Sequence, residues 1–346
     1  MGAVESFLGN AIQRFLMPQE VPDWYEGGKK SSFPPAPEGS LLSIGHVRLA
    51  VPDLEKARKF YEALGAGCAS GKDSAQEVRV SIGSSALVLQ AAAEPTEGKT
   101  RLSRAWHGHF YIWADNVTRT FDTCSDHAKA LGDEELVQEV VRVKNEATVD
   151  ALVVTDPIHA NHFMLNQVPK GLRDGLQEMS GKKPDADYNG PNLLAMIDVC
   201  RLVPKGQAKM VSEFYSHYLG AAVTPKQGGY AVHFSISNKI RQTLTIKEDD
   251  EADHEEAEEE GVSEICLYMP SSARFNVALG KVADAGLLHG TPSTPQEAME
   301  AKEFRTRGCF VEGSTIPVLT LEHIIRSPDH PESPLSVPTA SGTPDV

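Results

Sequence analysis

One long local pattern occurs twice in this chain, and its repetition restricts the fold more than any other feature. Residues 44–67 (IGHVRLAVPDLEKARKFYEALGAG) contain an alternating strand, a Val-Pro turn and a helix that closes with Phe-Tyr and Leu-Gly. Residues 195–223 (AMIDVCRLVPKGQAKMVSEFYSHYLGAAV) contain the same landmarks in the same order. Because side chains alternate between the two faces of a strand, His46 and Arg48 share one face. We expect a face with these two polar groups to line a more hydrated environment than an apolar core.

Further strands follow each copy of the pattern, and two other segments keep the same order of elements without the Phe-Tyr signature. Asp53 is placed to cap the first helix, and Gly65 is placed to end it. The chain therefore predicts four strand–helix–strand units in an α+β fold. In chain order they are unit one (44–90), unit two (107–167), unit three (195–247) and unit four (262–324).

Composition suggests where the units are grouped and separated. A polar stretch with Gly and Pro lies between units two and three, and the residues after Ser327 are rich in Pro and Ser. An acidic loop is predicted at 247–261. The predicted domains are an N-terminal extension with an amphipathic helix (1–41), a first half (42–168), a linker (169–192), a second half (193–327) and a disordered tail (328–346).

The overall composition excludes several classes of function. The chain has 346 residues, 40% of them hydrophobic, and a net charge of −15, which argues against a nucleic-acid partner. No apolar run reaches the length of a membrane span. Five scattered cysteines without a CxxC motif favour a reducing compartment, so we expect a cytoplasmic protein. The opening MGAVES matches a myristoylation pattern at Gly2, but no basic segment follows to strengthen an anchor.

Residues 44–67 and 195–223 resemble the start of modules in the glyoxalase I, bleomycin-resistance protein and extradiol dioxygenase superfamily, also called the vicinal oxygen chelate (VOC) superfamily. The resemblance extends more loosely over units two and four. It implies four βαβββ units that form two glyoxalase-like, cup-shaped mixed β-sheet domains. It also implies a site inside each cup, with ligands from the first and last strands of each unit. The superfamily includes metal-dependent enzymes and metal-free binding proteins, so the fold alone does not select the chemistry.

The resemblance assigns eight candidate ligand positions, and all four first-strand positions hold side chains that can bind a metal ion. The first-strand positions are His46, His109, Asp198 and Glu264. The last-strand positions are Gln90, Met164, Thr245 or Lys247, and Thr320 or Glu322. Histidine, glutamine and glutamate together suit a divalent ion such as Zn²⁺, Ni²⁺, Fe²⁺ or Mn²⁺. A histidine on an alternating strand is, however, more often an ordinary polar side chain of the sheet than a metal ligand.

The pairing of the units decides which of these residues meet. If each half folds on itself, the first half collects His46, Gln90, His109 and Met164, with His109 as the alternative metal ligand. If the halves exchange units, unit one faces unit four and collects His46, Gln90, Glu264 and Glu322. The remaining pair then holds His109, Met164 and Asp198 with Lys247 beside the acid, which resembles a degenerate site. We favour the exchanged arrangement, either in a monomer with pseudo-dimeric halves or in a homodimer.

The leading functional hypothesis that follows is a metal-dependent isomerase or lyase. The ion would hold two vicinal oxygens of a small or aromatic substrate and stabilise an enediolate, while Glu322 or Glu264 moves the proton. Substrate binding is expected from Tyr111, Trp113, Arg48 and Met164.

Two other functions stay open. A ring-cleaving, extradiol-type dioxygenase is weakened by Met164 at a ligand position. A metal-free protein that binds or sequesters a small molecule would use the aromatic wall of Tyr111 and Trp113. Arg48 is expected to meet either an anionic group of the substrate or neighbouring acids.

Overall fold

The computed structural model describes residues 36–70, 76–91, 106–131, 137–141, 151–155, 162–168, 192–237, 240–250 and 263–333. The chain divides into two units, Met1–Ala36 and Pro37–Val346, and all the described residues except Ala36 belong to the second. The predicted N-terminal helix, the pattern at Gly2 and most of the predicted linker lie outside the described residues.

The four predicted units are present, and each begins with a strand followed by a helix. Unit one contains β1 (Ser43–Val51), α2 (Leu54–Ala63), β2 (Gly67–Ser70), β3 (Glu77–Ile82) and β4 (Ser85–Ala91). Unit two contains β5 (Gly108–Ala114), α3 (Val117–Leu131), β6 (Val137–Val141), β7 (Ala151–Thr155) and β8 (His162–Gln167). Unit three contains β9 (Leu193–Pro204), α5 (Ala208–His217), β10 (Val223–Lys226), β11 (Gly229–Ser237) and β12 (Ile240–Asp249). Unit four contains β13 (Glu264–Tyr268), α6 (Ser272–Asp284), α7 (Pro295–Ala301), β14 (Glu303–Thr306), β15 (Cys309–Phe310), β16 (Pro317–Leu319) and β17 (Glu322–Arg326).

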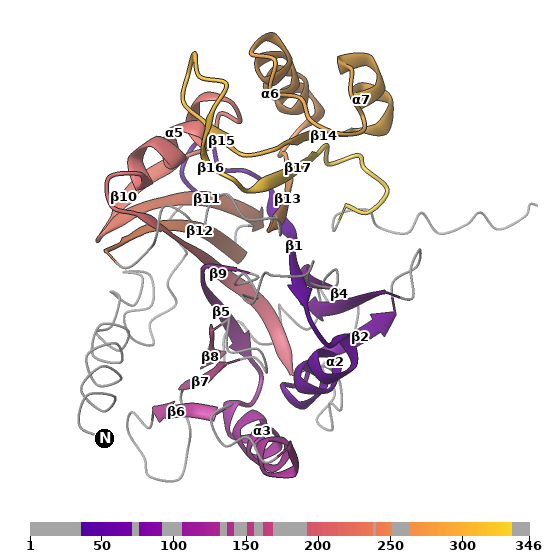
Figure 1. Cartoon of the computed structure of the whole chain (residues 1–346), viewed down its shortest axis with the longest axis vertical. Helices are drawn as coiled ribbons and strands as arrows, with labels where there is room; N and C mark the ends of the chain where they lie inside the picture. Colours follow the sequence, from indigo (N-terminus) through magenta and orange to yellow (C-terminus); the bar gives the residue numbers. More distant parts are fainter. Residues whose placement is uncertain are drawn as a thin grey trace, which may run out of the picture. The chain divides into compact units, whose positions relative to one another are not determined.

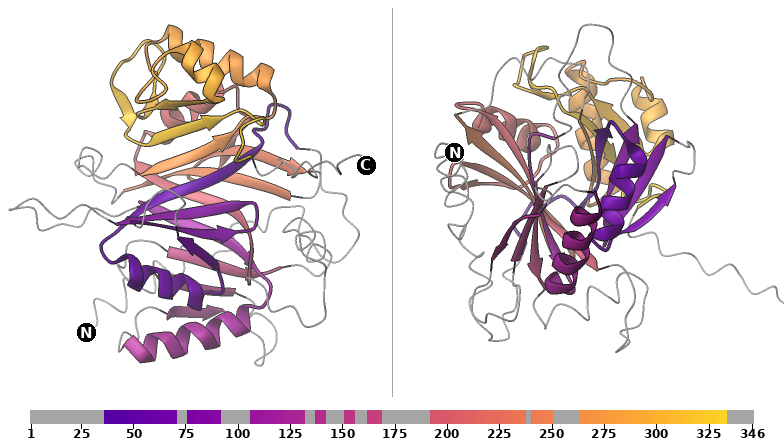
Figure 2. Two further views of the ribbon diagram at one scale, coloured as in Figure 1. Left: turned by 90° about the vertical axis from the view of Figure 1, so that its right-hand side faces the viewer. Right: turned by 60° about the horizontal axis from the view of Figure 1, so that its bottom comes forward.

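The strands form two large mixed sheets. The first sheet has the order β14-β17-β13-β1-β4-β3-β2, and the second has the order β10-β11-β12-β9-β5-β8-β7-β6. In each sheet two first strands meet in antiparallel pairing, β1 with β13 and β5 with β9 (Figure 1). Figure 2 shows the same strands from two further sides. Unit one therefore joins unit four and unit two joins unit three, which is the exchanged arrangement, and the predicted α+β fold of mixed sheets is confirmed.

Three details differ from the expectation. Unit four places only three strands in the first sheet, because β15 and β16 pair with each other in a separate two-stranded sheet. Strand β12 continues to Asp249, so residues 247–249 of the predicted acidic loop are strand, and residues 251–262 lie outside the described part. Residues 328–333, predicted as part of a disordered tail, instead form turns, and Glu332 accepts hydrogen bonds from Tyr268 and Arg326 of the first sheet.

The start and end of α2 follow the local sequence. The Asp53 carboxylate accepts a hydrogen bond from the backbone N–H of Lys56 at 2.9 Å, which satisfies a free donor at the helix start. Gly65 has a φ of 85°, a conformation that glycine adopts without steric cost. The Asp53 cap fixes where α2 begins and therefore where β1 ends.

One hydrophobic core contains residues of both sheets, and β1 contributes one of its faces to it. Ile44, Val47 and Leu49 of β1 are fully buried in this core. The register of β1 shifts between Ile44 and His46, so Ile44 lies on the core side with Val47. The positions that alternate with Val47 and Leu49, and their partners on β13, point to the opposite face, which we call the inner face of the first sheet. It carries His46, Arg48, Glu264 and Cys266, and a small separate apolar cluster of Leu42, Cys266, Tyr268 and Ile324.

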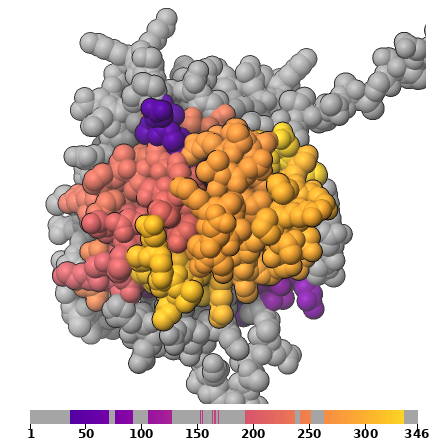
Figure 3. Space-filling model, turned by 90° about the horizontal axis from the view of Figure 1, so that it is seen from above, coloured from indigo at the N-terminus to yellow at the C-terminus, as the bar shows by residue number. Residues whose placement is uncertain are grey.

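Units three and four also pack against each other through α5 and the β15–β16 hairpin. In Figure 3 the surfaces of these two parts of the chain adjoin. The Tyr215 hydroxyl of α5 is 2.8 Å from Nε2 of His323, which is fully buried. Burial lowers the pKa of His323 to about 3, so this histidine is neutral. His323 neighbours Glu322 in sequence but faces the packed side of β17, not the inner face.

A buried glutamine links the two sheets. The Gln242 side-chain oxygen of β12 accepts from the backbone N–H of Ile44 at 2.9 Å. Its amide nitrogen donates to the Ser85 hydroxyl at 2.7 Å and to the Met196 carbonyl at 2.9 Å. One side chain thereby satisfies polar groups on three strands, β1, β4 and β9.

The substitution Gln242→Leu should lower the free energy of unfolding by about 2–4 kcal/mol, because it leaves buried polar groups of Ile44, Ser85 and Met196 without this partner. Urea denaturation followed by circular dichroism measures the change. Gln296→Leu on the exposed surface of α7 is the control and should change it by less than about 0.5 kcal/mol. Equal effects of the two substitutions would contradict the role assigned to Gln242.

Candidate functional site

Side chains on the inner face of the first sheet form three rows across the strands. Row one contains Glu322, Glu264 and Arg48, paired in register across β17, β13 and β1. Row two contains Arg305, Ile324, Cys266 and His46. Row three contains Glu303, Arg326 and Tyr268. Gln90 of β4 pairs in register with Ala50, two residues after Arg48 along β1, and so lies just beyond row one.

Glu264 is the centre of a buried polar cluster. Its side chain is 7% exposed, and its Oε1 lies 3.3 Å from Nε2 of His46. The same oxygen accepts a hydrogen bond from Nε of Arg48 at 2.9 Å. Nη1 of Arg48 donates to Gln90 and to Glu77, each at 3.3 Å. Two residues that are 218 positions apart, His46 and Glu264, therefore meet as the exchanged arrangement requires.

Arg305 of β14 supplies a second positive charge to the same cluster. Its Nη1 lies 3.7 Å from Oε2 of Glu264 and 3.6 Å from Oε1 of Glu322. The guanidinium thus bridges the two carboxylates that the sequence proposes as ligands and proton carriers. Both oxygens of Glu264 are occupied by cationic side chains.

The pKa shifts agree with this charge arrangement. Burial alone would raise the pKa of Glu264, but the hydrogen bonds and charges of His46 and Arg48 outweigh it and lower the pKa to about 2. Burial lowers the pKa of His46 more than Glu264 raises it. At neutral pH the cluster therefore holds an ionised Glu264 and a neutral His46.

The predicted metal ligands do not fit a divalent ion in this arrangement. Arg48 and Arg305 both lie against Glu264, so an ion bound to this carboxylate would meet two full positive charges at short range. The side-chain oxygen of Gln90 is also turned to Arg48. Within the described ranges, no group of three or more His, Cys, Asp or Glu is arranged to hold a metal ion.

The aromatic candidates lie in the other sheet. Tyr111 and Trp113 are on β5 of the second sheet, and Tyr111 is opposite Asp198 in register. His109 pairs in register with Cys200, also in the second sheet, so neither it nor the aromatic residues join His46 and Arg48. Met164 pairs with Tyr111 along the backbone, and its side chain lies outside the described part.

In the second sheet a lysine lies beside Asp198, but this lysine is Lys226 and not the predicted Lys247. Lys226 of β10 lies 3.3 Å from Oδ2 of Asp198, whereas Lys247 was expected there. The Thr245 hydroxyl donates to Asp198 at 2.8 Å. Lys226 was missed because β10 is an edge strand whose pairing with β11 is not visible in the local sequence. The carboxylate of Asp198 is therefore satisfied by a lysine and a threonine.

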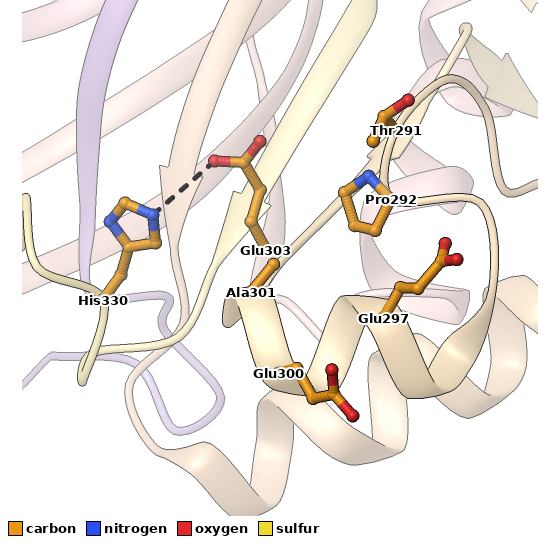
Figure 4. A pocket seen from close by; sticks show the side chains of 7 residues that line it. All are labelled: Thr291, Pro292, Glu297, Glu300, Ala301, Glu303 and His330. Atoms are coloured by element: carbon orange, nitrogen blue, oxygen red, sulfur yellow. Dashed lines mark ion pairs between the residues drawn. The ribbon is translucent and has the colours of Figure 1, made fainter.

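A separate hollow of about 470 Å³ lies at the edge of the first sheet (Figure 4). Glu297 and Glu300 of α7 line one side, and Glu303 and His330 lie on the other. Nε2 of His330 is 3.8 Å from Glu303. The hollow contains none of the predicted site residues.

Comparison with known proteins assigns the family of the first part of the chain. The model of the Glyoxalase/Bleomycin resistance protein/Dioxygenase superfamily matches residues 43–161. The chain contains a domain of this superfamily. A comparison with curated proteins gives no match. The matched residues cover unit one and the part of unit two before β8, and these two units lie in different sheets here.

Solved structures that resemble parts of this chain include a lactoylglutathione lyase from Agrobacterium tumefaciens. It has 24% identity and a TM-score of 0.25 over 36% of this chain and 92% of that chain. A glyoxalase/bleomycin resistance protein from Streptomyces sp. has 22% identity and a TM-score of 0.26 over 36% and 100%. The cppA protein from Streptococcus pneumoniae has 10% identity and a TM-score of 0.44 over 83% of this chain and 98% of that chain.

No helix within the described ranges is long and apolar enough to cross a membrane.

The substitution Glu264→Gln should lower the free energy of unfolding by about 3 kcal/mol at pH 7, because it leaves Arg48 and His46 without their buried carboxylate. The pKa of Glu264 is depressed from 4.5 to about 2, so its stabilisation is fully present above pH 4.5 and is lost as the pH falls towards 2. Urea denaturation at pH 7 and at pH 3 should therefore show a smaller difference between the two proteins at pH 3.

Glu55→Gln is the matched control, since the Glu55 side chain is 65% exposed on α2. It should change the stability by less than about 0.5 kcal/mol at both pH values. A Glu264→Gln effect that is equally large at pH 3 and pH 7 would contradict the ionised, arginine-held Glu264.

Proposed function

We propose that this chain is a small-molecule-binding protein of the superfamily that works without a metal ion, and that its ligand binds on the inner face of the first sheet. The observation that carries the proposal is the pair of guanidinium groups on Glu264. Arginines are permanently charged, so Arg48 and Arg305 oppose a divalent ion at every physiological pH. We further propose a monomer, because both sheets are completed within one chain. We also propose a cytoplasmic location, because the five cysteines are free thiols, which a reducing compartment maintains.

The accessible side chains of the inner face that support binding are polar. Row one ends in the partly exposed groups of Arg48 and Glu322, which are 27% and 23% exposed. In row two, Cys266, Ile324 and the neutral imidazole of His46 are at most 5% exposed. A guanidinium and a carboxylate that both reach solvent are suited to hydrogen-bond a small polar ligand.

The metal-dependent isomerase or lyase is the second candidate, and the 3.3 Å approach of His46 to Glu264 favours it. A neutral imidazole and a carboxylate from opposite units are the donors that such an enzyme needs. Against it, a carboxylate with a pKa of about 2 is a weak base at neutral pH, so Glu264 is poorly suited to move a proton. The dioxygenase would need the same ion and meets the same opposition from Arg48 and Arg305.

Elemental analysis of protein purified without chelators, followed by titration with Zn²⁺, Ni²⁺, Mn²⁺ and Fe²⁺, distinguishes the candidates. We expect well under one equivalent of metal as purified and no saturable binding or thermal stabilisation on addition. One tightly held equivalent that His46→Ala removes would reject the metal-free function and support the enzyme. His109→Ala is the matched control, because His109 lies in the second sheet and should not alter metal content.

A further inference from the structure

Row one of the inner face continues beyond Arg48 onto two further strands. Arg48 of β1 pairs in register with Val88 of β4, and Val88 pairs in register with Arg79 of β3. Side chains opposite one another in paired strands lie on the same face of a sheet, so Arg79 joins Arg48 in row one. The residues on either side of Arg79, Val78 and Val80, are buried in the core, which agrees with this orientation.

Arg79 is an exposed cation that has no hydrogen bond or ion pair within the described part of the chain. By contrast, Arg48, Arg305 and Arg326 each contact a carboxylate. Burial is the main cause of the lowered pKa of His46, and the positive charges of Arg326 and Arg79 lower it further. The charge of Arg79 therefore acts on the inner face and is not balanced by a bound carboxylate.

Two more hydrogen-bond donors reach the same open surface. The buried Glu264 accepts from Nε of Arg48 at 2.9 Å and so orients this guanidinium, whose side chain is 27% exposed. Nη1 of Arg48 donates to Gln90 and to Glu77, and no described partner holds its Nη2. Gln90 is exposed, and because its side-chain oxygen accepts from Arg48, its amide nitrogen is available as a donor.

These three donor groups stand on adjacent strands. Strand β4, which carries Gln90, lies between β1 with Arg48 and β3 with Arg79. Neighbouring strands are about 4.8 Å apart, so the two arginines start about 10 Å apart on either side of β4. Both guanidinium groups can therefore reach one anion placed above β4. The planar fork of arginine matches the oxygens of a carboxylate or a phosphate.

Glu77 opposes an anion at this place, and it is also the group that an anion would replace. It lies two residues before Arg79 on the same face of β3, its side chain is 29% exposed, and its carboxylate is 3.3 Å from Nη1 of Arg48. A solvent-exposed ion pair contributes little to stability, so a ligand can take its place on Arg48. Glu264, at 7% exposure, stays and keeps Arg48 oriented.

We propose that Arg79, Arg48 and Gln90 form the anchor for the oxoanion of a small polar ligand, a carboxylate or a phosphate, on the open part of the inner face. Arg79 supplies the unbalanced charge, Nη2 of Arg48 supplies an oriented donor, and Glu77 turns away from Arg48 when the ligand binds. The proposal rests on the proposed function, because it names the class of ligand for the same inner face.

Isothermal titration calorimetry of the full chain at constant ionic strength tests the proposal, with inorganic phosphate and acetate as separate probes. At least one of the two ions should bind at a single site, and the tighter one identifies the oxoanion. Arg79→Gln should weaken this binding about tenfold or more, because it removes a charged donor. Glu77→Gln should strengthen it about fivefold, because it removes the competing carboxylate.

Arg58→Gln is the matched control, since the Arg58 side chain is 40% exposed on α2, which packs on the core side of the sheet. It should leave the affinity unchanged, and circular dichroism shows that each variant is folded. Equal affinities of Arg79→Gln and Arg58→Gln, or no binding of either ion by the unsubstituted protein and by Glu77→Gln, would overturn the proposal. Metal content measured on the same samples tests the proposed function separately, so a metal-free protein that binds neither ion rejects only the anchor.

Discussion

The antiparallel pairing of β1 with β13 is the interaction on which the rest of the first sheet depends. It joins the first strand of unit one to the first strand of unit four, with Arg48 opposite Glu264. Within unit one, Arg48 meets only the partly exposed Glu77 and the neutral Gln90, and His46 has no carboxylate beside it among the described contacts. The pairing supplies Glu264, and through β17 and β14 it also supplies Glu322 and Arg305. The first sheet therefore joins strands of unit one and unit four and creates a charge cluster that neither half contains.

The composition of this cluster determines its chemistry more than the fold does. A histidine and two carboxylates on adjacent strands are the residue types of a metal site, but here arginines from β1 and β14 hold the carboxylates. A buried carboxylate requires a compensating charge, and a guanidinium provides it with fixed geometry. Arg305 therefore takes the electrostatic role that a bound cation would have between Glu264 and Glu322.

The sequence predicted the units and the faces of their strands because these depend on local periodicity. Alternation along residues 44–51 assigned His46 and Arg48 to one face, and the expectation that Arg48 meets neighbouring acids is confirmed at Glu264. Pairing of the units was left open in part, since the register between strands 218 residues apart has no local signal. The predicted roles of His46, Gln90, Glu264 and Glu322 as metal ligands are not tested by the structure, and the two arginines on Glu264 argue against them.

Arg305 and Glu332 were missed for different physical reasons. The segment Glu303-Phe304-Arg305-Thr306 alternates polar and apolar groups, and this short signal could have indicated a strand with Arg305 on the polar face. It follows α7, an element that the repeated pattern does not contain. Glu332 lies in a stretch whose Pro and Ser content predicted disorder, and its contacts come from Arg326 and Tyr268, which the strand pairing brings together.

The most direct test of the arginine-held cluster is a Zn²⁺ titration of the double variant Arg48→Met/Arg305→Met beside the unsubstituted protein, measured by calorimetry at neutral pH. Removing both guanidinium groups frees Glu264 and Glu322 next to His46, so the account predicts that the double variant gains one Zn²⁺ site while the unsubstituted protein has none. A Zn²⁺ site of equal affinity in both proteins would contradict the account.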